Sequence, residues 1–341
     1  MKKILFTKPM KAEVAGGYKI PVCEKDEVVL KVLRIGVCGT DIQVYAGKNR
    51  YTHFPITPFH EGLATVFAVG AKVENVCVGD SVVIRPIISC GKCYACTHGH
   101  ENACEEFNCL GVQSDGLGAE YVVINKKYVY RLPKFCSKDA LILTEPFAVG
   151  VHAARRGQIE NKKVLVIGAG TIGNFTAQAC QLQGAEKVCI CDISEAKVDT
   201  ARKSGIELCI NSTNKTLTQV YENAFGSFPD VIIDCAASKA VFSQIISSAG
   251  KTTTVVIVGN YSQTLEVDIA AIQRNELNVL GNITYTEEDF LCALNLMLEG
   301  KVYTDGFITK RFALNQVNEM MDYAFENRGI NMKTIMDFEE G

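Results

Sequence analysis

Four cysteines between residues 90 and 104 could hold a metal ion. They follow the pattern C-x2-C-x2-C-x7-C, as Cys90, Cys93, Cys96 and Cys104. Four thiolates suit tetrahedral zinc, and a closed shell of four sulfurs leaves no position for a substrate. An iron–sulfur cluster is the alternative, but the spacing of the fourth cysteine fits neither ferredoxin pattern well. The pattern therefore predicts a structural zinc site, with the nearby His98, His100 and Cys109 interpreted as loop residues.

A glycine-rich turn of the form G-x-G-x-x-G lies between an apolar run and a helical pattern. Its sequence is Gly168-Ala-Gly170-Thr171-Ile172-Gly173, directly after Lys-Val-Leu-Val-Ile at 163–167. In this context the first glycine makes a tight turn, the second lets the backbone approach a pyrophosphate, and the third allows close helix packing. The helix N-terminus adds unpaired N–H groups and the positive end of its dipole. The segment predicts a dinucleotide site.

The next apolar run ends at an acidic residue, which bears on the choice of dinucleotide. The run Lys-Val-Cys-Ile-Cys at 187–191 is followed by Asp192, 19 residues beyond Gly173. A carboxylate there can accept hydrogen bonds from the adenosine ribose, and its charge would repel a 2′-phosphate. NAD is therefore expected rather than NADP. Lys197, five residues later, is either a further ribose contact or a surface residue.

A second set of potential metal ligands is spread along the chain before the glycine-rich turn. It comprises Cys38 in Cys38-Gly-Thr-Asp41, the pair His60-Glu61, and Glu145 in Thr-Glu145-Pro. One sulfur, one imidazole and one or two carboxylates can bind zinc while leaving a position open for water or a substrate oxygen. Each residue alone is weak evidence, because a single cysteine or histidine more often belongs to a core or a loop.

The composition is that of a globular protein of ordinary charge. The chain has 341 residues, a net charge of −3 at pH 7 and 15 cysteines, and its length indicates two domains. No run of Lys and Arg could neutralise a series of phosphates, so nucleic acid is not an expected partner. No apolar run approaches the roughly 18 residues of a membrane span, and residues 4–6 are too short for a signal peptide. The protein is expected to be cytoplasmic, with metal binding explaining some of the cysteines better than disulfides do.

The elements that must position these residues change in kind near residue 150. Before it, short β-type runs are broken by Gly and Pro; they cover 28–37, 63–70, 81–85 and 119–124. From residue 163, strand patterns alternate with helical ones, as expected for a doubly wound parallel sheet in an α/β fold. Beyond this come a helix, a strand, a helix and a last strand, expected at 287–298, 307–312, 314–325 and 332–338.

In this combination and chain order, the motifs resemble those of the zinc-containing medium-chain dehydrogenases over essentially the whole chain. The similarity is greatest to the branch with sorbitol, threonine and L-galactonate dehydrogenases, through His60-Glu61, Leu-Thr-Glu-Pro at 143–146 and the stretch 110–121. The resemblance implies a GroES-like β domain formed by residues 1–149 and 285–341, with a zinc lobe at about 90–104. It also implies a Rossmann NAD-binding domain at 150–284 and a homodimer or homotetramer.

The resemblance further assigns roles to individual residues. A catalytic zinc in the cleft between the domains would be held by Cys38, His60 and one or both of Glu61 and Glu145. With the cysteine site this gives two zinc ions per chain. The catalytic zinc would act as a Lewis acid on the substrate hydroxyl, so that hydride can pass to NAD. Thr40 would pass the proton onward. Backbone flanking the nicotinamide would come from Val258, Gly259, Asn282 and Ile283.

Two positions depart from the family pattern. Phe59 stands where a glycine usually precedes the His-Glu pair, which puts the local backbone turn in question. Gln43 stands where many relatives carry a histidine that helps to relay the proton, and an amide cannot titrate. The onward route of the proton is therefore not assigned.

Cationic groups occur in a loop that borders the substrate cleft in the resembled family. The loop contains Lys48, Asn49, Arg50 and His53. Such groups can pair with a carboxylate or phosphate, so the hypothesis is a sugar acid oxidised at a secondary alcohol. A solvated loop without a substrate role is an equal alternative, with a neutral polyol or an amino alcohol of the threonine type as the substrate. A non-catalytic zinc or redox-sensing protein is less favoured, because all the motifs are present.

Overall fold

The computed structural model describes residues 1–134, 138–261 and 263–338, and the chain divides into two compact units. Unit 1 comprises Met1–Glu145 and Ile308–Gly341, and unit 2 comprises Pro146–Phe307. Unit 2 is thus a continuous insertion between the two segments of unit 1. The predicted α/β class is confirmed, and the strands and helices expected by residue range begin and end within about three residues of their predicted positions.

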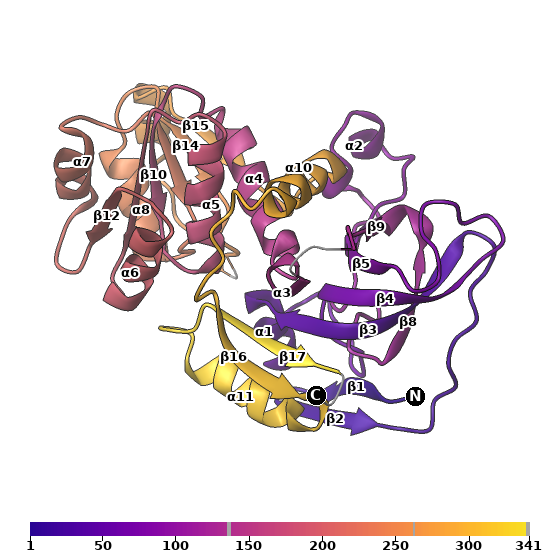
Figure 1. Ribbon diagram of the computed structural model, residues 1–341. Coiled ribbons are helices and arrows are strands. Elements are labelled where there is room, and N and C mark those ends of the chain that lie inside the picture. Colours follow the sequence, from indigo (N-terminus) through magenta and orange to yellow (C-terminus); the bar gives the residue numbers. More distant parts are fainter. Residues whose placement is uncertain (135–137, 262, 339–341) are drawn as a thin grey trace. The chain divides into compact units, whose positions relative to one another are not determined.

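Unit 1 is built on a seven-stranded sheet that combines segments from both of its parts. The order is β16-β17-β3-β4-β5-β9, and β8 also pairs with β3. The strands are β3 (Glu27–Val37), β4 (Glu61–Val69), β5 (Ser81–Ile84), β8 (Tyr121–Asn125), β9 (Val129–Arg131), β16 (Ile308–Ala313) and β17 (Lys333–Asp337). Strand β17 is antiparallel to β3, with Thr334 opposite Val37, and Figure 1 shows these two strands side by side.

Smaller elements complete unit 1. Two strand pairs are β1 (Lys3–Lys8) with β2 (Lys11–Ala15), and β6 (Ile87–Ile88) with β7 (Asn108–Cys109). The α-helices are α1 (Gly39–Tyr45), α2 (Tyr94–Thr97), α3 (Lys138–Leu141) and α11 (Val317–Glu326). The 3-10 helices are η1 (Glu101–Ala103), η2 (Lys126–Tyr128) and η3 (Leu314–Gln316). Helix α11 packs against β2 and the sheet, so it covers apolar side chains of this unit.

Unit 2 contains a six-stranded parallel sheet with the order β12-β11-β10-β13-β14-β15. The strands are β10 (Lys163–Ile167), β11 (Lys187–Asp192), β12 (Leu208–Asn211), β13 (Val231–Asp234), β14 (Thr254–Ile257) and β15 (Asn278–Gly281). Strand order reverses between β10 and β13, and the crevice at such a switch point is the usual ligand site of open α/β sheets.

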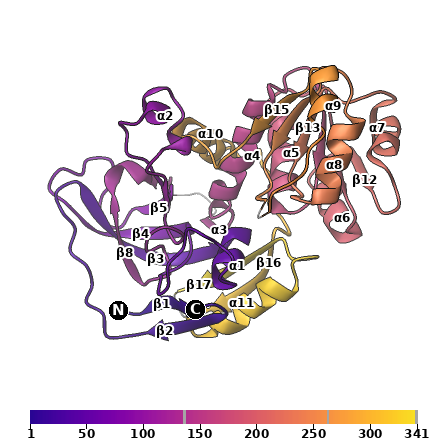
Figure 2. The same ribbon diagram turned by 180° about the vertical axis from the view of Figure 1, so that it is seen from behind.

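The helices of unit 2 connect these strands. They are α4 (Thr144–Gly157, which begins in unit 1), α5 (Thr171–Leu182), α6 (Glu195–Lys203), α7 (Leu217–Phe225), α8 (Lys239–Ser248), α9 (Ile269–Arg274) and α10 (Glu287–Leu298). Side chains of α7, α8 and α9 share one apolar cluster with the sheet, and Figure 2 shows these helices near one another. Helices α5 and α6 pack against β10, β11 and β12. The sheet is therefore covered by helices on both faces.

Residues 285–307 belong to unit 2, which differs from the predicted boundary near residue 284. Gln178 of α5 is bonded in both directions to the backbone of Tyr303, at 2.8 and 3.2 Å. The ring of Phe307 stacks on that of Phe175 with 4.5 Å between centroids. These contacts to α5 hold the segment in unit 2, and the sequence pattern gave no sign of them.

Within the described ranges, no helix combines the length and the apolar character that crossing a bilayer requires.

Candidate active site

Cys38, His60 and Glu61 come together in unit 1, with one potential ligand atom from each within 4.8 Å of the others. Cys38 is half-buried just before α1, while His60 and Glu61 are buried at the start of β4. Gly36 of β3 lies opposite Glu61, and a Cβ there would be 2.2 Å from Glu61 Oε2. Only glycine leaves room for this carboxylate. We call Cys38, His60 and Glu61 the buried donor set.

Asp41 contacts the first two members of this set. Its Oδ2 accepts a hydrogen bond from the Cys38 N–H at 2.7 Å, and its Oδ1 lies 3.3 Å from His60 Nδ1. Burial by itself lowers the pKa of His60, but the Asp41 carboxylate and the nearby thiols outweigh burial, so that pKa stands well above its usual value. With Nδ1 facing a carboxylate, Nε2 is the nitrogen available to a metal. Asp41 was given no role among the residues predicted from the sequence, although its place three residues after Cys38 at the start of a helix is a local signal.

Lys333 of β17 forms a buried ion pair with Glu61. Its Nζ lies 2.5 and 2.7 Å from the two carboxylate oxygens and donates to the Val37 carbonyl at 3.2 Å. The two residues are 3% and 0% exposed. Burial lowers the pKa of Lys333, but the charge of Glu61 raises it above the usual value, so the lysine stays a cation. Lys333 was not among the residues predicted from the sequence; its local signal is a cation directly before the short run Thr-Ile-Met at 334–336.

Glu145, the second residue of α4, is buried but lies outside the buried donor set as far as the described residues show. It is close enough to affect Lys333 and the thiol of Cys109 electrostatically. The structure thus brings Glu61, and not Glu145, into the compact set. The prediction that either glutamate binds zinc stays a prediction.

Three further residues lie around the buried donor set. Cys109, interpreted from the sequence as a loop residue, is instead a buried residue of β7, where burial raises the pKa of its thiol to about 12. His60 and Cys38 are among the groups that act on this thiol. Thr40 and Gln43 are half-buried residues of α1, the helix that begins directly after Cys38. The role of Thr40 in proton transfer stays a prediction.

The turn before His60 keeps a glycine-like backbone even though its residue is Phe59. Phe59 has φ 75°, in the left-handed region that costs other residues roughly 1–2 kcal/mol. Its ring is fully buried and meets Phe6 edge to face with 5.7 Å between centroids. A Cβ on Gly116 would lie 2.1 Å from the Phe59 carbonyl oxygen. Burial of the ring and close packing of the backbone therefore offset the strain, and the turn is retained.

The cysteine lobe, residues 90–104, forms a second group of potential ligands in unit 1. The Sγ atoms of Cys90 and Cys96 are 4.0 Å apart, and those of Cys93 and Cys104 are 3.9 Å apart. Four sulfurs arranged tetrahedrally at about 2.3 Å from a zinc ion would be about 3.8 Å from one another. None of the cysteines that the structure describes is in a disulfide. The four sulfurs therefore fit a tetrahedral metal without rearrangement.

The glycine-rich turn of unit 2 has the geometry that a dinucleotide needs. Gly168 has φ 96°, and a Cβ on Gly173 would lie 1.7 Å from the Gly168 carbonyl oxygen. A Cβ on Gly170 would meet nothing within 4 Å, so the backbone is open to a ligand there. Thr171 and Ile172 begin α5, and no side chain caps this helix. Its N-terminus is therefore suited to a phosphate group.

Asn174 stabilises this turn from inside the unit. Its side chain is fully buried, and its Nδ2 donates to the carbonyls of Ala169 and Gly170 at 2.5 and 3.3 Å. With these carbonyls engaged, the turn is held in one conformation. The residue directly follows Gly173, but the glycine motif itself carries no signal for it.

Asp192 ends β11 beside the glycine-rich turn. Its Oδ2 accepts a hydrogen bond from Ala169 N–H at 2.7 Å, and its Oδ1 accepts one from Ser194 N–H at 2.8 Å. The carboxylate is thus fixed next to the turn, at the edge where the sequence predicts a ribose contact. Lys197 is a half-buried residue of α6, and both interpretations of it stay open.

The four residues predicted beside the nicotinamide follow β14 and β15 in unit 2. Asn282 N–H donates to the Ile257 carbonyl at 3.0 Å, which joins the ends of the two strands. Both polar atoms of the Asn282 side chain are buried and have no hydrogen-bond partner in the part of the chain that is described. A buried amide without partners costs about 1–3 kcal/mol. Such an amide is compatible with a polar ligand group at this edge.

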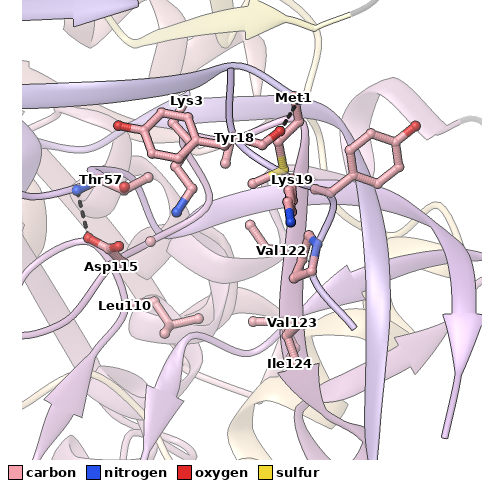
Figure 3. A pocket seen from close by; sticks show the side chains of 14 residues that line it. Met1, Lys3, Tyr18, Lys19, Thr57, Leu110, Asp115, Val122, Val123 and Ile124 are labelled. Carbon is pink, nitrogen blue, oxygen red and sulfur yellow. Dashed lines mark hydrogen bonds between the residues drawn. The ribbon is translucent and has the colours of Figure 1, made fainter. Parts of the chain in front are cut away.

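A pocket of about 280 Å³ lies elsewhere in unit 1. Figure 3 shows Lys3, Tyr18 and Lys19 around it, with the Asp115 carboxylate accepting a hydrogen bond from Thr57 N–H at 2.9 Å. Its lining includes no member of the buried donor set and no cysteine of the lobe. We assign this pocket no part in the chemistry.

Comparisons with known proteins cover both units. Residues 24–134 match the family model of the alcohol dehydrogenase GroES-like domain, and residues 171–299 match that of zinc-binding dehydrogenase. The chain is 29% identical to starvation-sensing protein RspB of Escherichia coli (strain K12), over 100% of both chains. It is 31% identical to galactitol 1-phosphate 5-dehydrogenase of the same strain, over 84% of this chain and 86% of that one. A crystal structure of rspB from E. coli CFT073, described as an alcohol dehydrogenase complexed with NADH, matches with a TM-score of 0.92, 29% identity and 99% coverage of both chains.

Proposed function

Because the chain belongs to the zinc-dependent medium-chain dehydrogenases, in their polyol branch, we propose that it transfers a hydride between a secondary alcohol of a sugar acid and NAD. The chain is an NAD-dependent zinc alcohol or polyol dehydrogenase, and what we propose beyond this is that its substrate is a sugar acid. The observation that carries the proposal is the buried donor set in a chain that also has the glycine-rich turn and Asp192.

Both metal-binding groups have the donor chemistry that zinc prefers. The buried donor set offers one thiol and one imidazole, and a carboxylate can come from Glu61 or from the buried Glu145; such a mixed set is typical of a site that keeps a position open, whereas the cysteine lobe offers four sulfurs. When bound, the catalytic zinc supplies a Lewis acid for the substrate hydroxyl, and NAD supplies the hydride acceptor. The cysteine lobe has no position for substrate, so its zinc is proposed to be structural.

The surrounding residues prepare the buried donor set for this chemistry. Asp41 places a carboxylate oxygen 3.3 Å from His60 Nδ1, and Lys333 neutralises Glu61. Because Lys333 engages both oxygens of Glu61, we assign the resting carboxylate ligand to Glu145. Thr40, on the helix that follows Cys38, is the proposed first acceptor of the substrate proton.

The zinc content of two variants tests the choice between the glutamates. Glu145→Gln is expected to lower the content from two zinc ions per chain to one, because an amide is a poorer ligand than a carboxylate. Glu61→Gln is expected to keep two. The reverse pattern would assign the ligand to Glu61.

The loop after α1 supports an anionic substrate. Arg50 is exposed, its Nη2 donates to the Tyr51 hydroxyl at 2.7 Å, and its guanidinium lies 4.8 Å from the centroid of that ring. Lys48 and His53 are exposed as well. Exposed cations can pair with a carboxylate or phosphate. The relative named galactitol 1-phosphate 5-dehydrogenase is named for an anionic polyol.

The experiment is a measurement of NADH formation across a panel of sugar acids, neutral polyols and amino alcohols. A sugar acid is expected to give the highest kcat/KM. Arg50→Ala is expected to raise KM for the acid by about tenfold, the loss of one charge-assisted hydrogen bond, and to leave neutral polyols unchanged. Arg131→Ala, which removes another exposed arginine of unit 1, is the control. No NADH formation with any alcohol by zinc-loaded protein would contradict the proposed activity.

A further inference from the structure

Asp234 is a buried carboxylate at the end of β13 that the proposed chemistry does not use. It is 0% exposed, and its strand lies between β10 and β14 in the sheet of unit 2. The loops after these three strands approach one another closely around it. A Cβ on Gly168 would lie 3.1 Å from Ala236 N, and one on Gly259 would lie 2.7 Å from Ala237 N. Asp234 therefore stands where the loops that face the cofactor site meet.

Asp234 accepts hydrogen bonds from two of these loops. Its Oδ1 accepts from Ala236 N–H at 3.0 Å, within the loop after its own strand. Its backbone carbonyl accepts from Val258 and Gly259 N–H, each at 2.9 Å. Its Oδ2 accepts from the Tyr261 hydroxyl at 2.5 Å. The first two residues and the fourth residue of the loop after β14 are thus bonded to this one aspartate.

Tyr261 is held so that its hydroxyl reaches Asp234. Its ring meets Phe242 edge to face with 5.8 Å between centroids, and its hydroxyl also lies 3.4 Å from the Ser238 carbonyl oxygen. Burial, followed by the hydrogen bond to Asp234 and the charge of that residue, raises the pKa of Tyr261, and burial raises the pKa of Asp234 against the effect of its hydrogen-bond donors. The tyrosine therefore keeps its proton and donates it in a charge-assisted hydrogen bond, which is stronger than a neutral one.

We propose that Asp234 and Tyr261 form a latch that positions loop 258–261 for the nicotinamide half of NAD. The inference rests on the proposed placement of the nicotinamide beside Val258 and Gly259. Residues 258–261 lie beyond the end of β14 and in no helix, so their conformation depends on contacts such as this one. Tyr261 is a positioning residue, because it acts through the backbone of the loop.

The test compares a ligand that contains nicotinamide with one that lacks it. Tyr261→Phe removes the hydroxyl and keeps the ring that packs on Phe242. In the zinc-loaded enzyme this variant is expected to bind NADH about tenfold more weakly, since loop 258–261 loses the bond that fixes it and part of the binding free energy must then order the loop. Its affinity for ADP-ribose is expected to stay within about twofold of wild type, because Asp192 and the glycine-rich turn are untouched. KM for NAD should rise more than KM for the alcohol.

Tyr221→Phe is the matched control, because the Tyr221 hydroxyl is bonded to Ser248 Oγ at 3.0 Å between α7 and α8. It is expected to bind both ligands as wild type does. Asp234→Asn should also lower the affinity for NADH, as Tyr261→Phe does. Unchanged NADH affinity in Tyr261→Phe, or an equal loss of NADH and ADP-ribose, would overturn the latch while the proposed function stands. Failure of the wild-type enzyme to bind NADH would overturn the proposed function and the latch with it.

Discussion

The cysteine lobe and the buried donor set are both groups of potential metal ligands in unit 1, but they are built in opposite ways. The lobe takes four identical donors from one short segment, and three of the four are only half-buried. The buried donor set takes three different donors from two segments, and it depends on Asp41 and on Lys333 from β17. A local set of thiols needs little support from the rest of the fold. A mixed set in the interior needs counter-charges and a fixed backbone.

The largest effect on turnover should come from replacing the sulfur ligand of the buried donor set. Cys38→Ser is expected to lower kcat by at least about a thousandfold, because the several kcal/mol of Lewis-acid stabilisation are lost with the zinc. Steady-state NADH formation measures this loss. Zinc content should fall from two ions per chain to one, while NADH affinity, which depends on unit 2, should change little. Wild-type turnover in Cys38→Ser would contradict the assignment of this set to catalysis.

Removing Lys333, the cation paired with Glu61 of the set, should have the next largest effect, which is on stability. Lys333→Met leaves Glu61 buried without its cation, which is expected to lower the free energy of unfolding by about 3–5 kcal/mol. Denaturant unfolding measures the change. Lys301→Met removes a lysine from an exposed pair with Glu299, and its effect should stay within about 1 kcal/mol.

A double variant separates charge from shape at this position. Adding Glu61→Leu to Lys333→Met removes both charges, so the double variant should recover part of the lost stability although its activity stays low. If the double variant were less stable than Lys333→Met alone, the ion pair could not be the cause of the loss.

Breaking the cysteine lobe should affect stability more than chemistry. Cys96→Ser is expected to remove one zinc ion per chain and to lower stability by about 2 kcal/mol, a common size for loss of a single buried interaction. The kcat of the protein that remains folded should stay within about threefold of wild type, since this metal has no position for substrate. Metal analysis and thermal unfolding measure the first two effects. Complete loss of kcat in the folded variant would contradict a purely structural role for the cysteine lobe.

The smallest effect concerns the strained turn before His60. Phe59→Ala and Phe59→Gly both remove the buried ring, but only glycine also removes the cost of a positive φ. The glycine variant is therefore expected to be about 1 kcal/mol more stable than the alanine variant, the opposite of the usual order. Thermal unfolding of the two proteins measures this difference. An alanine variant as stable as the glycine variant would show that the turn relaxes.

Features that depend on adjacent residues could be predicted from the sequence. The cysteine lobe and the glycine-rich turn each occupy one short segment, so residue type and spacing are sufficient to identify them. Gly168 and Gly173 are required by the local geometry of a strand, a turn and a helix. The strands and helices also followed from local patterns.

Features that depend on strand register or distant loops could not be predicted in this way. The pairing of Lys333 with Glu61 joins residues 272 positions apart and depends on β17 lying next to β3. The burial of Cys109 in β7 and the bond between Asp234 and Tyr261 arise only after the chain has folded. The same holds for residues 285–307, whose place in unit 2 depends on contacts with α5.

The distance along the chain between Glu61 and Lys333 has a consequence for synthesis of the protein. As the nascent chain leaves the ribosome, Glu61 appears first, unit 2 follows as a complete folding unit, and β17 comes after it. Until β17 pairs with β3, Glu61 lacks its lysine, and an unneutralised carboxylate favours water over the interior. The ion pair can therefore form only after β17 has been synthesised, which follows the synthesis of all of unit 2.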